Sequence, residues 1–70
     1  MKAYEQISHG GATGPLTKGA AGFIMNKATH ATFEGYFGNV FELVTTNEPQ
    51  LFPIGIAGIT VSQGKVTLLG

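Results

Sequence analysis

The chain has 70 residues, enough for a single domain, and its four basic residues balance its four acidic ones, which gives a formal net charge of zero. This neutrality removes the long-range attraction that nucleic acid or an anionic membrane surface requires, and the absence of cysteine excludes a disulfide framework. No apolar run approaches 18 residues and residues 1–6 lack the apolar core of a signal peptide, so we expect synthesis in the cytoplasm and no membrane span.

The first 22 residues are predicted to lie outside the main β structure. Residues 3–8 could form a short strand, but residues 9–22 hold five glycines and Pro15 and show neither helical nor strand periodicity. This glycine-rich segment can be an extended arm that contacts a neighbour or a flexible linker. We therefore expect an extended arm or loop over residues 1–22 and a small β domain over residues 23–70.

The middle of the chain predicts a hairpin. Residues 23–30 can be a strand or two helical turns, but they are too few, and lack a clear apolar stripe, for a helix. From residue 31 onward apolar and polar residues alternate, which places Phe33 and Phe37 on one face of a half-buried strand. Gly38 and Asn39 fit a two-residue type II′ turn, and residues 40–45 would return as the second strand.

The last twenty residues predict a second hairpin. Ile54 and Ile56 share one face whereas Ile59 and Val61 share the other, so a bulge at residues 57–58 is expected to restore one inward face. Residues 62–64 should form the turn, with Gly64 at positive φ, and Val66 and Leu68 should point inward. The expected fold is all-β: a small antiparallel sandwich or barrel of four to five strands with a glycine-rich N-terminal arm.

No residues combine into a recognisable catalytic, cofactor or metal site. His9 and His30 are far apart in the sequence and no aspartate or cysteine is present to complete either one. Glu34 and Glu42 could lie opposite each other across the hairpin. Two outward, solvent-exposed carboxylates are a better interpretation than an acid–base pair, because like charges directly opposite each other repel. Residues 9–14 are rich in glycine but lack the Lys-Ser/Thr pair of a phosphate loop. We therefore expect a protein that is not an enzyme and needs neither metal nor cofactor.

The sequence favours association with other protein chains. A chain of this size buries a small core, glycine raises the entropy cost of folding, and neither disulfides nor a metal site can compensate. Charged residues make up only 11% of the chain, and the aromatic residues lack the surrounding cations that base stacking needs. The predicted subunit contacts are five residues that each have a large apolar or aromatic side chain: Leu16, Phe23, Tyr36, Phe52 and Ile54.

Residues 31–69 resemble the end of short virion proteins of tailed phages. The resemblance lies in Phe33 opening a strand, a turn around Pro49, and the stretch from Pro53 to Val66 with its Ser-Gln-Gly turn before the last strand. It implies a capsid decoration, cement or fibre-base protein present in many copies on the virion, made in the host cytoplasm and bound to copies of itself and to a larger capsid or assembly protein. The alternative from another class is a small ring-forming β-barrel that binds nucleic acid or a peptide. Neutral charge argues against its nucleic-acid form.

Overall fold

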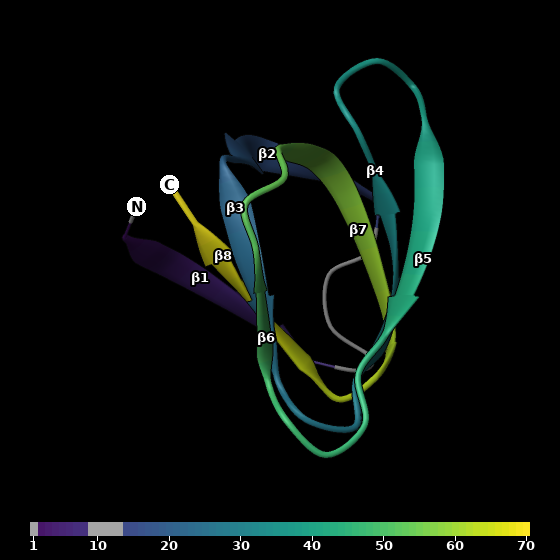
Figure 1. The fold of residues 1–70 in the computed structure, drawn as a ribbon. Helices are drawn as coiled ribbons and strands as arrows, with labels where there is room; N and C mark the ends of the chain where they lie inside the picture. The colour runs from purple at the N-terminus through teal and green to yellow at the C-terminus, as the bar shows by residue number, and fades with distance from the viewer. Residues whose placement is uncertain (1, 9–13) are drawn as a thin grey trace.

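The computed structural model describes residues 2–8 and 14–70, which form eight β-strands and no helix (Figure 1). The strands are β1 (Ala3–Ser8), β2 (Gly14–Ala20), β3 (Gly22–Met25), β4 (His30–Glu34), β5 (Val40–Val44), β6 (Gln50–Phe52), β7 (Ile56–Gln63) and β8 (Lys65–Leu69). The expected all-β antiparallel sandwich is confirmed, with eight strands where sequence periodicity predicted four to five. In the described ranges no helix is long and apolar enough to cross a membrane.

The strands pair as a long hairpin that has been rolled up. β1 pairs with β8, β2 with β7, β3 with β6, and β4 with β5, so the first half of the chain meets the second half in reverse order. Additional pairing of β3 with β8 and of β4 with β7 gives two four-stranded sheets, ordered β1-β8-β3-β6 and β2-β7-β4-β5. An eight-stranded double sheet with this winding is a jelly roll. The sheets have four edge strands, so the fold is a sandwich and not a closed barrel.

The boundary expected at residue 22 does not separate an arm from a body. β1 pairs with β8 along its length, and β2 pairs with β7 at Gly14, Pro15 and Ala20, so both strands lie in the sheets (Figure 1). β2 was missed because its membership depends on backbone hydrogen bonds to β7, which leave no periodic pattern in a glycine- and proline-containing segment. Residues 9–13 lie outside the described part, and with them the predictions for His9 and for the first five residues of the glycine-rich segment.

The core between the sheets is built around stacked phenylalanines. The rings of Phe23 and Phe33 lie 4.2 Å apart, Phe52 lies 5.3 Å from Phe23, and Phe41 lies 5.5 Å from Phe33. The other fully or nearly fully buried apolar residues are Ile7, Ala20, Met25, Ala31, Ile56, Ile59, Val61, Val66, Leu68 and Leu69. The accessible surface of the chain is 4176 Å², matching the roughly 4,200 Å² of a compact monomer of its mass. The fold therefore closes its own core, and neighbours are not needed to cover it.

Two buried threonines connect three turns at the end of the sandwich that contains Gly64. The Thr29 amide donates to Thr45 Oγ1 at 3.1 Å, and Thr45 Oγ1 donates to the Asn26 carbonyl. Thr29 Oγ1 in turn donates to the Lys65 carbonyl at 3.2 Å and accepts from the Lys65 amide at 3.3 Å. Gly64 has a φ of 82°, as the sequence predicted. Its missing Cβ leaves the space that Thr29 occupies.

The β4–β5 connection is a three-residue loop, which corrects the predicted type II′ turn. The Gly35 amide donates to the Asn39 carbonyl at 2.7 Å and the Gly38 amide to the Gly35 carbonyl at 3.3 Å, while Gly38 has a φ of 83°. This is a type I turn followed by a left-handed residue, the usual form of a three-residue hairpin. Because the turn begins two residues earlier than expected, Phe37 lies at the tip instead of facing the core, and Glu34 pairs with Val40.

The predicted change of face in β7 is present. Ile56 and Ile59 are both buried although they have opposite parity along the strand. The register with β2 shifts at the same place, where Gly58 pairs with Pro15 and Ile56 with Ala20. The extra residues lie on β2, so the irregularity predicted at residues 57–58 arises mainly from the neighbouring strand.

Candidate functional site

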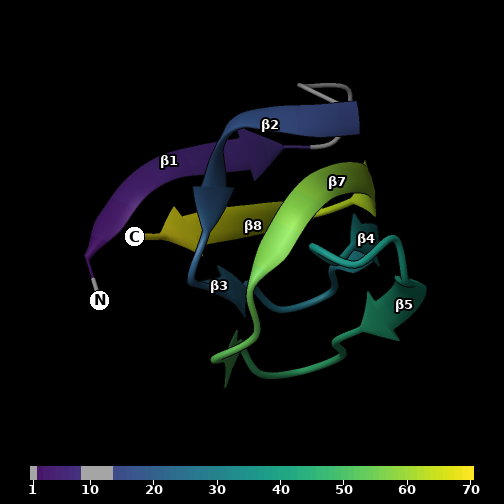
Figure 2. The ribbon, with the colours of Figure 1, turned by 90° about the horizontal axis from the view of Figure 1, so that it is seen from above.

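The exposed large apolar side chains of the described residues lie on the β4–β5 hairpin and in or directly after β6. They are Tyr36, Phe37, Val40, Val44, Leu51 and Ile54, and we call this set the apolar edge. They lie on the β4–β5 loop, on the edge strands β5 and β6, and on the segment after β6. Figure 2 shows β5 on the side of the sandwich opposite β1 and β2. Four of the six exposed side chains, residues 36, 37, 40 and 44, lie on the single β4–β5 hairpin, and exposed apolar side chains grouped in this way are typical of an interaction surface.

The tip of the β4–β5 hairpin presents Phe37 to solvent, with 98% of its surface exposed. The neighbouring Tyr36 holds the loop in place, because its hydroxyl donates to the Ala20 carbonyl at 3.3 Å. Its ring lies against two glycines: a Cβ at Gly19 would overlap the Tyr36 hydroxyl, and one at Gly55 would lie 2.8 Å from a ring carbon. The loop is therefore fixed to β2 and to the β6–β7 segment, and Phe37 is exposed on a positioned support.

Strand β5 is apolar on both faces. Phe41 and Leu43 are half-buried and pack against the core, while Val40 and Val44 point to the outer face and are 65% and 60% exposed. Glu42 lies between the two valines on the outer face. Its Oε2 is 2.7 Å from His30 Nε2, but this nitrogen has no aligned hydrogen-bond partner among the described residues. The Glu42 carboxylate and the His30 imidazole therefore lie in close contact on this face of the sheet.

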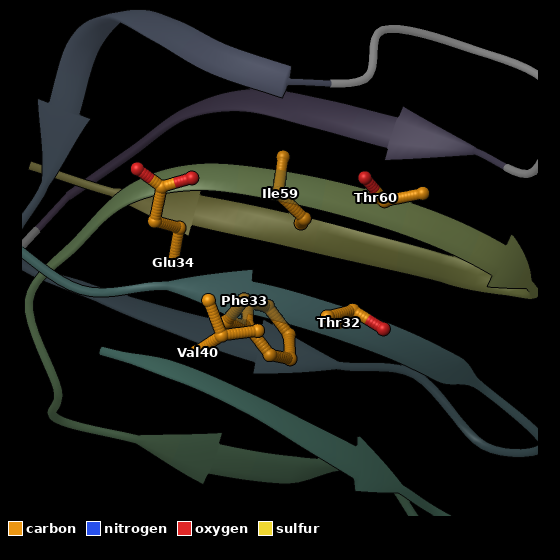
Figure 3. A pocket seen from close by; sticks show the side chains of 6 residues that line it. All are labelled: Thr32, Phe33, Glu34, Val40, Ile59 and Thr60. Carbon is orange, nitrogen blue, oxygen red and sulfur yellow. The ribbon is translucent and has the colours of Figure 1, made fainter. Parts of the chain in front are cut away.

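A shallow hollow of about 80 Å³ lies on the outer face of the sheet β2-β7-β4-β5. Thr32 of β4 and Thr60 of β7 are paired across it, and Glu34 and Val40 stand nearby (Figure 3). Phe33 and Ile59 complete its lining. The hollow brings together hydroxyls and one carboxylate, a set that can hydrogen-bond water or a small polar group but contains no nucleophile paired with a base.

A second hollow of about 340 Å³ lies where the two ends of the described chain meet, beside Lys2, Ala3, Tyr4 and Gly70. Burial raises the pKa of the Tyr4 hydroxyl, and the charges of Glu5 and Tyr36 raise it further. In residues 2–8 and 14–70 no group of three or more histidine, aspartate or glutamate side chains could hold a metal ion.

The residues predicted as subunit contacts fall into two groups. Tyr36 and Ile54 are 57% and 43% exposed and belong to the apolar edge. Phe23 is fully buried in the phenylalanine stack and offers no surface to a neighbour, while Leu16 and Phe52 are partly buried against the core. An apolar side chain alone could not tell these groups apart, because the stack forms only when β3 and β6 become neighbours.

Sequence reasoning missed four members of the apolar edge. Phe37 was placed on the same strand face as Phe33, which is buried, and Val40, Val44 and Leu51 received no role. One signal was present: Val40 and Val44 alternate with Phe41 and Leu43, so β5 is apolar on both faces. A strand with two apolar faces is normally buried on both sides, and β5 is instead an edge strand with its outer face in solvent.

No family model, curated protein or solved structure matches the chain.

Proposed function

We propose that this chain is a non-enzymatic structural protein that binds neighbouring subunits of a larger assembly through the apolar edge. A virion surface is the proposed setting, with a capsid decoration or cement role. The neighbours are further copies of the chain and a larger capsid or assembly protein. The observation that carries the proposal is the exposure of Phe37 at 98%, on a loop that Tyr36 fixes to the body.

Physical reasoning supports an adhesive role for this surface. Removing large apolar side chains from water is favourable, so a group of them exposed together gains free energy when a partner covers it. The fold already closes its core, so these side chains are not needed inside it. Aromatic side chains such as Phe37 and Tyr36 are among the residues that contribute most to protein interfaces. The outer face of the β2-β7-β4-β5 sheet carries the carboxylates of Glu34 and Glu42. Their negative charge disfavours nucleic acid as the partner.

The virion setting is supported by the resemblance of residues 31–69 to tailed-phage proteins and by the jelly-roll winding, which viral capsid domains also use. The second support is an analogy at the level of the fold, and jelly rolls also serve other functions. Mass spectrometry of purified particles from the organism that encodes the chain tests the setting. We expect the chain in many copies per particle, and its absence from the particles would refute the setting while leaving the adhesive role open.

Sedimentation velocity over a micromolar to millimolar range tests the adhesive role. We expect the wild-type chain to associate as its concentration rises, and Phe37→Ser to shift the association to at least about tenfold higher concentration, since a central aromatic contact contributes 2 kcal/mol or more. Gln6→Ser, an exposed change on β1 at the opposite edge, is the matched control and should behave as wild type. A wild-type chain that stays monomeric throughout, or equal effects of the two variants, would contradict the proposal.

A further inference from the structure

The four edge strands of the sandwich differ in how well they are protected against pairing with another strand. β1 has an irregular register between Ala3 and Glu5, and β2 is irregular between Pro15 and Ala20. β6 has only three residues and is flanked by Pro49 and Pro53. Bulges, prolines and short length are the usual means by which proteins prevent edge pairing.

β5 lacks each of these protections. All five of its residues pair with β4 in regular register, and it contains neither proline nor lysine. β5 lies at the edge of its sheet (Figures 1 and 2). Its side chains Val40 and Val44 are exposed. A regular, apolar and uncovered edge strand is a template for a further strand.

The hydrogen bonds of the hairpin identify the backbone groups that this edge offers. Gly35 bonds to Asn39, and the Thr45 amide donates to the Thr29 carbonyl at 2.8 Å. In an antiparallel ladder bonded and non-bonded pairs alternate, so between these two points Phe41 and Leu43 bond to β4. The N–H and C=O groups of Val40, Glu42 and Val44 therefore point away from the sheet.

The strand is complementary to itself in the antiparallel direction. Val40, Glu42 and Val44 form a palindrome about Glu42, so a two-fold axis there sets Val40 opposite the second copy's Val44 on the outer face. On the inner face the same axis sets Phe41 opposite the second copy's Leu43, which extends the core of each sandwich into the other. A surface that matches itself in this way suits a closed, two-fold interface.

Val40 and Val44 are the exposed apolar side chains that lie on β5 itself, and strand pairing at this edge would bring both of them against the second copy.

We propose that β5 pairs antiparallel with β5 of a second copy across a two-fold axis at Glu42, so that the β2-β7-β4-β5 sheets of two protomers become one continuous sheet. This inference rests on the proposed function and specifies how two copies meet. The pairing brings the two Glu42 carboxylates together, which is unfavourable because like charges directly opposite each other destabilise a strand pair.

Residue-resolved hydrogen exchange is the first test. The amides of Val40, Glu42 and Val44 should exchange rapidly at concentrations where the chain is monomeric and slowly where it is associated. The amides of Phe41 and Leu43 bond to β4 in both states and serve as controls in the same spectrum. Rapid exchange at Val40, Glu42 and Val44 in the associated chain would overturn the pairing.

Disulfide cross-linking tests the axis, because the chain has no cysteine of its own. In a hydrogen-bonded pair the opposed Cα atoms lie ~5.5 Å apart, within the range that a disulfide spans. Glu42→Cys should therefore give a cross-linked dimer on mild oxidation. Thr60→Cys, exposed on the same face two strands away, should not. Equal cross-linking at both positions, or none at residue 42, would refute the two-fold axis at Glu42.

Two further variants separate the pairing from the proposed function. Glu42→Gln removes the opposed charges and keeps a side chain of the same size beside His30. It should tighten association about 1.4- to 5-fold, with circular dichroism unchanged. Val44→Pro removes a donor that β4 does not use and should weaken association at least about tenfold. If the wild-type chain associates but neither variant alters it, this inference fails and the proposed function stands; a wild-type chain that never associates refutes both. If Val44→Pro disrupts only binding to a purified capsid protein, the edge serves that protein and the inference fails.

Discussion

Replacement of Gly64 should destabilise the fold far more than the same replacement at Gly38, although both glycines have nearly the same backbone conformation. Their φ values are 82° and 83°. An L-residue in the left-handed region costs about 1–2 kcal/mol, and this cost applies equally to Gly64→Ala and Gly38→Ala. The two positions differ in what the added Cβ would meet.

At Gly38 the added Cβ would have no described atom within 4 Å, whereas at Gly64 it would overlap Thr29 Oγ1 and lie 2.8 Å from Thr29 Cα and 2.9 Å from the Ala28 carbonyl oxygen. Thr29 would have to move and give up its bonds to the Lys65 amide and carbonyl. Lost hydrogen bonds of about 1 kcal/mol each, with polar groups left unpaired in the interior, add roughly 2–3 kcal/mol. We therefore expect a loss of about 3–5 kcal/mol for Gly64→Ala and about 1–2 kcal/mol for Gly38→Ala.

Urea denaturation of the two variants and the wild type, each followed by circular dichroism in the monomeric concentration range, measures these losses. In a domain of this size the difference corresponds to roughly 10–20 °C in melting temperature. Equal losses for the two variants would show that Thr29 yields freely and that the threonine network does not hold the turn.

Three further changes test the core, the threonine network and the raised pKa. Phe33→Ala should cost about 3–5 kcal/mol in urea denaturation because it removes one of the two inner rings of the stack, and a loss below about 1 kcal/mol would contradict that packing. Thr45→Val should cost about 2–3 kcal/mol, since it leaves the Thr29 amide and the Asn26 carbonyl without their partner, and a neutral effect in the same assay would mean that water replaces the hydroxyl. The raised pKa of Tyr4 favours its neutral form in the fold, so its contribution to stability is complete below the unfolded-state value of about 10 and is lost as pH rises through the folded value. Tyr4→Phe should therefore flatten the fall in stability above about pH 10. An unchanged pH profile would show that the Tyr4 hydroxyl is not the source of that fall.

Local chemistry explains which parts of the fold could be predicted from the sequence. The last hairpin was predicted because Gly64 and the alternation of Val66 and Leu68 act within a few residues of each other. β6 was missed because three residues between prolines carry no periodicity, and its pairing with β3 joins segments more than twenty residues apart. The turn at residues 35–39 was placed too late, because Gly35 and Gly38 both allow a turn and only hydrogen bonding to Asn39 decides between them.

The candidate site was less predictable than the fold. Tyr36 and Ile54 were named as contacts for their apolar character, but the same reasoning also named Phe23, which the stack buries. Exposure depends on which strand ends up at the edge of a sheet, and that depends on pairings between residues distant in the sequence. The threonine network likewise joins Asn26, Thr45 and Lys65, so no short motif could have indicated it.

The contact between the two ends of the described chain has a consequence for folding kinetics. The Lys2 amide donates to the Gly70 carbonyl at 3.1 Å and the Gly70 amide to the Lys2 carbonyl at 2.8 Å, so β1 and β8 close the largest loop in the molecule. Pairing that is so distant in sequence slows folding. A circular permutant that joins residues 1 and 70 by a short linker and opens in the β5–β6 loop would make β8 and β1 a local hairpin without changing any strand's neighbours. It should keep the same sandwich and reach it faster.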